Sequence, residues 1–69
     1  MVVAMYKENR KSNPEHIRVH RYSDNTLHVE GITSSYAHEI GGTFDTLEEV
    51  EAFLKQRSRP WGYSLITKL

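Results

Sequence analysis

Residues 42–57 constrain the fold most, because the chain changes there from strand-like to helical patterning. Before this segment, apolar and polar residues alternate in short runs, which is typical of strands with one buried face. Within it, apolar residues recur at the spacing of one helical stripe, namely Leu47, Val50, Phe53 and Leu54. The pattern predicts a sheet built mainly from the strands before the helix, with the helix packed on one face.

Both ends of this helix are marked in the sequence. Thr46 with Glu49 three residues later fits a capping box, and Asp45 with Glu48 is an equally spaced alternative. Acidic residues come first along the helix and basic residues last, which is the order that the helix dipole favours. Pro60 then prevents the helix from continuing, because proline lacks the backbone N–H that the next turn requires.

Five segments have the pattern of β-strands, and polar residues or glycines separate them. The strands are expected at residues 2–7, 16–22, 26–32, 36–40 and 62–69. A turn is expected at residues 23–25, a loop at 33–35 and a sharp bend at Gly41 and Gly42. The chain is therefore expected to be a single α+β domain over residues 1–69. Its order would be ββββαβ, with a mostly antiparallel sheet of four to five strands.

The second and third strands are expected to form a hairpin. Side chains directly opposite in an antiparallel pair share a face, so matching the apolar residues predicts the register. It sets Ile17 opposite Gly31, Val19 opposite Val29, Arg18 opposite Glu30 and His20 opposite His28. One face of the hairpin is then apolar and the other polar.

Composition excludes several classes of function. Nine basic residues balance nine acidic ones, so no net charge draws the chain to nucleic acid or to an anionic membrane. The absence of cysteine rules out disulfides and cysteine-bound zinc, which fits a cytoplasmic protein. The apolar run at residues 1–5 is too short for a signal peptide or a membrane span. We therefore expect no membrane association.

No pattern in the chain predicts catalysis or a cofactor. The serines lack the Gly-x-Ser-x-Gly elbow of hydrolases, and so short a chain has little core from which to exclude water. His20 and His28 could supply two metal ligands across the hairpin, but two ligands do not make a site. We expect a protein that is not an enzyme and that carries neither metal nor cofactor.

Basic residues and tyrosines gather in the first third of the chain, among them Arg10, Lys11, Arg18, Arg21, Tyr6 and Tyr22. A sheet that presents aromatic rings beside arginines can stack single-stranded bases. Acidic residues interspersed with them or just beyond dilute the positive charge, namely Glu8, Glu15, Asp24 and Glu30. Direct nucleic-acid binding is therefore the second hypothesis, not the first.

The layout resembles a family of small phage-encoded anti-CRISPR proteins that act on a type I-F surveillance complex. The resemblance covers most of the chain and rests on Tyr6, Ile17, Val19, the hairpin, Phe44-Asp45, Glu49, Glu51 and the apolar stripe. It implies a protein that binds the backbone subunits of the RNA-guided complex with one sheet face and blocks target-DNA hybridisation. Of the binding positions that it implies, Tyr6 matches, whereas His20 stands in place of tyrosine and Gly31 in place of glutamate.

A second resemblance is to the C-terminal half of WGR domains, which bind DNA ends. It rests on the run from Phe44 to Phe53 and on Gly62-Tyr63 after a basic stretch. The Trp-Gly-Arg triplet that should precede the helix is absent, and Trp61-Gly62 follows the helix instead. The anti-CRISPR resemblance is therefore placed first.

We expect a non-enzymatic phage or mobile-element inhibitor that binds a bacterial CRISPR-Cas surveillance complex in the host cytoplasm. Binding is assigned to the sheet face opposite the helix, at Tyr6, Arg18, His20, Tyr22, His28 and Glu30. The alternative is a small nucleic-acid-binding module of the WGR-like or sheet-stacking kind. The chain could act as a monomer or as a homodimer joined through an edge strand, since a small core gains from association.

Overall fold

The computed structural model describes residues 1–34 and 36–69, and it contains five strands and one helix. The elements are β1 (Val2–Glu8), β2 (His16–Arg21), β3 (Leu27–Thr33), β4 (Tyr36–Phe44), α1 (Leu47–Arg57) and β5 (Tyr63–Lys68). The predicted α+β class and ββββαβ order are confirmed. Residue 35, in the expected loop at 33–35, lies outside the described residues. No helix in the described part is long and apolar enough to cross a membrane.

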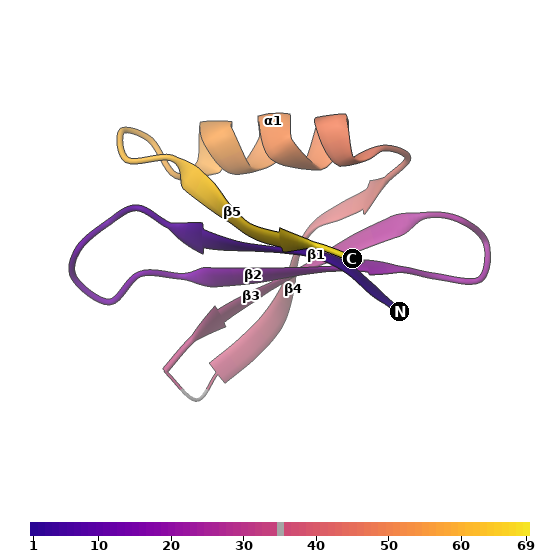
Figure 1. Cartoon of the computed structure of the whole chain (residues 1–69), viewed down its shortest axis with the longest axis horizontal. Coiled ribbons are helices and arrows are strands. Elements are labelled where there is room, and N and C mark those ends of the chain that lie inside the picture. The colour runs from indigo at the N-terminus through magenta and orange to yellow at the C-terminus, as the bar shows by residue number, and fades with distance from the viewer. Residues whose placement is uncertain (35) are drawn as a thin grey trace.

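The strands form one sheet in the order β4-β3-β2-β1-β5, and all neighbouring strands run antiparallel. The first four strands follow one another across the sheet, and β5 returns after the helix to pair with β1. Figure 1 shows α1 on one side of the sheet. This arrangement makes β4 and β5 the two edges of the sheet.

The predicted hairpin register is confirmed. β2 and β3 pair Ile17 with Gly31, Arg18 with Glu30, Val19 with Val29 and His20 with His28. The turn is closed by a hydrogen bond from the Tyr22 backbone N–H to the Thr26 carbonyl oxygen, with 3.0 Å between nitrogen and oxygen. Asn25 takes a φ of 70°, a left-handed conformation that asparagine tolerates better than most residues.

The fourth strand does not end at Ile40 as expected, because β4 continues through Gly41 and Gly42 to Phe44. The register between β3 and β4 shifts at this point, because His28 pairs with Thr43 whereas the next residue, Val29, pairs with Ile40. The two glycines are therefore extra residues in a bulge. Gly41 has a φ of 81°, which a glycine adopts without steric cost.

The core lies between α1 and one face of the sheet. Its buried apolar residues are Ala4, Tyr6, Ile17, Val19, Leu27, Val29, Ile40, Val50 and Leu54. Leu47 and Phe53 pack at its margin, which confirms the predicted helical stripe. Burial of each large aliphatic side chain contributes roughly 1.5–3 kcal/mol. No element within residues 1–34 and 36–69 covers the opposite side, which we call the open face.

A buried polar network closes one end of the core. Glu15, which is 7% exposed, accepts hydrogen bonds from Arg57 of α1 at 3.3 Å and from the Tyr63 hydroxyl of β5. Gly31 leaves room for it, because a Cβ at that position would lie 2.5 Å from Glu15 Oε2. Burial raises the pKa of Glu15, but the hydrogen bonds from Arg57 and Tyr63 outweigh that effect. The net pKa therefore lies below its usual range.

Removal of the helix cap should cost measurable stability. Thr46 Oγ1 accepts from the Glu49 N–H at 3.2 Å, and Glu49 Oε1 accepts from the Thr46 N–H at 3.1 Å. We expect Thr46→Ala to lower the free energy of unfolding by about 1 kcal/mol in urea denaturation. Asp45→Ala is the matched control and should change it by no more than about 0.5 kcal/mol. Equal losses in the two variants would contradict this assignment of the cap.

Glu15 should make stability depend on pH in the acid range. Because its folded pKa lies below the unfolded value, its contribution is complete above the unfolded pKa and is lost as pH falls through the folded pKa. We expect Glu15→Gln to lower the free energy of unfolding at neutral pH and to flatten its decline between about pH 6 and pH 3. Urea denaturation across pH measures both, with exposed Glu48→Gln as control. Parallel declines for Glu15→Gln and the unaltered chain would refute this role.

Candidate binding face

Five of the six residues predicted to bind a partner come together on the open face. They are Arg18 and His20 of β2, Tyr22 just after β2, and His28 and Glu30 of β3. Alternate residues of the two strands, namely Ile17, Val19, Leu27 and Val29, point into the core, so the strand residues between them turn outward. The confirmed hairpin register then sets them opposite one another. The sixth residue, Tyr6, lies elsewhere.

A charged pair lies at the centre of this group. Glu30 Oε1 accepts hydrogen bonds from Arg18 Nε at 2.9 Å and from Arg18 Nη2 at 2.7 Å. The same oxygen lies 3.4 Å from His20 Nε2. The hydrogen bonds from Arg18 hold the pKa of Glu30 below its usual range, so Glu30 is ionised at neutral pH. The pair fixes the direction in which the Arg18 guanidinium points.

Beside this pair, the rings of Tyr22 and His28 are stacked. Their centroids are 3.8 Å apart and their planes differ by 13°. The histidine is fixed in turn, because its Nε2 lies 3.1 Å from Thr26 Oγ1 and its Nδ1 lies 3.3 Å from Glu39 Oε1 of β4. Tyr22 remains 50% exposed. The open face thus presents an aromatic ring that is held in place before any partner binds.

A shallow hollow of about 160 Å³ lies among these groups, lined by His20, Tyr22, His28, Val29, Glu30 and Glu39. It is smaller than the pockets of roughly 300–1,000 Å³ that hold drug-sized ligands. Its size suits a single side chain of a larger partner. Of its two carboxylates, Glu30 is paired with Arg18, so the negative charge open to a basic side chain of a partner is that of Glu39.

Glu39 is a member of this face that the sequence analysis missed. Its contact with His28 depends on β4 lying beside β3. No local sequence pattern indicates the order of the strands in the sheet. The alternation within β4 is a signal that could have indicated its direction. Ile40 is the apolar residue of that run and points into the core, so Glu39 must point outward.

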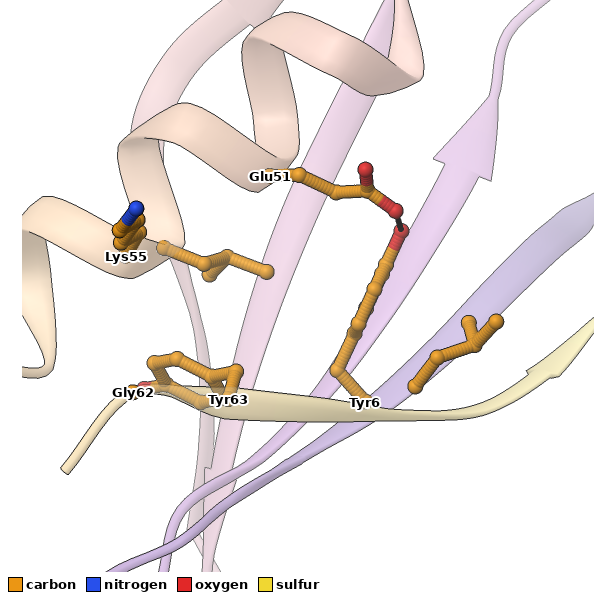
Figure 2. Close-up of a pocket in the computed structure, with 7 residues that line it drawn as sticks. Tyr6, Glu51, Lys55, Gly62 and Tyr63 are labelled. Carbon is orange, nitrogen blue, oxygen red and sulfur yellow. Dashed lines mark hydrogen bonds between the residues drawn. The ribbon is translucent and has the colours of Figure 1, made fainter.

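The expectation that Tyr6 is exposed on the open face is wrong. Tyr6 is 3% exposed and lies in the core, where its hydroxyl donates to Glu51 Oε2 of α1 at 2.8 Å (Figure 2). The physical reason is register, because Tyr6 pairs with the core residue Ile17 and must share its face. Burial raises the pKa of Tyr6, and the hydrogen bond to Glu51 raises it further.

Two of the basic residues considered for nucleic-acid binding, Arg10 and Arg18, are each paired with a carboxylate. Arg10 lies in the loop after β1, where its Nη2 is 3.2 Å from Glu8 Oε1 and donates to the Asn13 carbonyl at 2.9 Å. Arg18 is paired with Glu30 on the open face. Glu30 therefore offsets the positive charge of Arg18, which weakens its attraction for phosphates, the groups that supply most of the affinity for nucleic acid.

No group of three or more His, Asp or Glu side chains within residues 1–34 and 36–69 is arranged to hold a metal ion. His20 and His28 do lie opposite each other, as predicted. Each is next to a different carboxylate, since His20 contacts Glu30 and His28 contacts Glu39. The two histidines are parts of two separate polar contacts.

Comparison with protein-family models, with curated proteins and with solved structures found no match to this chain. The function is therefore inferred from the geometry of the open face and from the resemblance described above.

The two tyrosines should respond differently to truncation. Tyr6→Ala removes a buried ring, so we expect the free energy of unfolding to fall by about 3–5 kcal/mol. Tyr22→Ala removes a half-exposed ring and one stacking contact, so we expect a loss of about 1 kcal/mol or less. Urea denaturation measures both losses, and Tyr6→Phe isolates the hydrogen bond to Glu51 at about 1 kcal/mol. Comparable losses for the two alanine variants would show that the assignment of the faces is wrong.

Proposed function

We propose that the protein is a non-enzymatic inhibitor, encoded by a phage or mobile element, that binds a bacterial CRISPR-Cas surveillance complex in the host cytoplasm. One observation carries the proposal, namely the gathering of fixed aromatic and charged side chains on the open face. The identity of the partner is taken from the resemblance to anti-CRISPR proteins that act on a type I-F surveillance complex. The proposed binding residues are Arg18, His20, Tyr22, His28, Glu30 and Glu39.

The side chains of the open face favour a protein partner. Tyrosine and arginine are among the residue types that most often dominate binding energy in protein interfaces. Tyr22 is held by His28 and Arg18 by Glu30, so little side-chain freedom is lost on binding. The hollow beside Tyr22 and His28 would accept one side chain of the partner.

The charges of the open face suggest how such binding would block target DNA. Subunits that hold a guide RNA and its target present basic side chains towards the phosphates. Glu39 carries a carboxylate at the hollow that would pair with such a basic side chain in place of phosphate, whereas Glu30 is already paired with Arg18. Inhibition then requires only that the protein occupy the basic surface, with no chemical step.

Binding to a purified type I-F surveillance complex tests this proposal directly. We expect the protein to co-migrate with the complex in size-exclusion chromatography and to prevent its binding of target DNA in a gel-shift assay. Tyr22→Ala and Glu39→Lys should each weaken the inhibition by roughly tenfold or more. Glu39→Lys reverses a charge of the hollow without unpairing Arg18.

Tyr36→Ala is the matched control, because Tyr36 is an exposed tyrosine that pairs with Thr33 outside the open face. It should leave the inhibition unchanged. Failure to co-migrate, together with intact target-DNA binding by the complex, would refute the proposal. A shift of free single- or double-stranded DNA at low salt, lost steeply as salt is added, would instead favour the nucleic-acid-binding alternative.

A further inference from the structure

The outer edge of β5 carries an apolar surface that the open face does not explain. β5 pairs with β1 on one side and with no described strand on the other. Seven large apolar side chains are exposed among the described residues, and four of them belong to the last stretch of chain: Trp61, Leu65, Ile66 and Leu69. An edge strand with unpaired backbone groups and apolar side chains is a template for another strand.

The other edge of the sheet is less suited to pairing. β4 carries the charged Glu39 and a bulge formed by two glycines, and both features discourage the addition of a strand. β5 also contains a bulge, where its pairing passes from Leu65 to Thr67, but the residue in that bulge is the aliphatic Ile66. Its one charged residue, Lys68, lies at the strand end.

A groove of about 420 Å³ lies next to this edge, between α1 and β5 (Figure 2). Leu54 and Leu65 give it apolar walls, and Glu51 and Lys55 place opposite charges on the side of the helix. A strand added beyond β5 would direct every second side chain towards the helix side of the sheet. Such a side chain would lie beside Leu65 at the mouth of the groove.

We propose that a second copy of this chain occupies the edge, with β5 pairing antiparallel to β5 of the partner about a two-fold axis. A pairing centred at Leu65 or Ile66 sets aliphatic side chains against one another and keeps the two copies of Lys68 apart. The formal net charge of zero adds no repulsion between copies. A core with nine buried apolar residues in the described part of the chain is small, so the domain gains stability from the added burial.

This dimer leaves the open face accessible. Antiparallel pairing extends the sheet sideways, so the open faces of the two copies become one continuous surface and both helices lie on the other side. The dimer does not depend on the proposed function. It would make any binding through the open face bivalent, which raises avidity for a target with repeated subunits.

The oligomeric state over a range of protein concentrations tests the proposal. We expect sedimentation velocity to show a mass that doubles from 8.0 kDa as concentration rises. Leu65→Lys and Ile66→Lys should each raise the dimer dissociation constant by roughly tenfold or more, because each places like charges near the axis. Tyr36→Lys, at the exposed edge strand β4, is the control and should not change it. A mass of one chain at every concentration, or dissociation by Tyr36→Lys alone, would overturn the proposal.

A cross-linking experiment covers the case in which the lysine variants do not fold. The chain has no cysteine, so a single introduced thiol can react only with its copy in another chain. We expect Leu65→Cys or Ile66→Cys to form a disulfide-linked dimer under mild oxidation, because residues near a two-fold axis come within about 7 Å. Tyr36→Cys should form no disulfide-linked dimer under the same conditions, because Tyr36 lies on β4 at the other edge of the sheet. Failure of both β5 variants to cross-link would also overturn the dimer.

Discussion

The packing of Val50 and Leu54 of α1 against the sheet is the interaction on which the rest of the structure depends. These two side chains are the fully buried residues of the helix, and they cover the apolar positions of the strands. A chain of 69 residues with one helix can cover only one face of a five-stranded sheet. The other face remains available to present polar and aromatic side chains.

The two faces of the β2–β3 hairpin therefore have different roles. Ile17, Val19 and Val29 belong to the core, whereas the residues between them on each strand meet solvent. The core anchors the hairpin on one side, and on the other side Arg18 is paired with Glu30 and Tyr22 is stacked on His28. A surface whose side chains are already held in place can bind and block a partner with little loss of side-chain freedom. This is consistent with the inhibitor function that we propose.

Local features of this protein could be predicted from its sequence. The hairpin register followed from matching apolar residues, and the capping box at Thr46 and Glu49 followed from spacing alone. Both depend on neighbours along the chain or on one pair of adjacent strands. The glycine bulge in β4 could not be anticipated, because Gly41 and Gly42 fit a bend equally well until β3 is placed beside them.

The sequence by itself determined the elements, their order and the polar residues of one hairpin, because alternation and capping are local properties of the chain. Only the tertiary structure decided the order of the strands. That order buries Tyr6 opposite Ile17 and places Glu39 beside His28. It also decided that β5 lies at an edge. These outcomes depend on contacts between segments far apart in the chain, which no local pattern specifies.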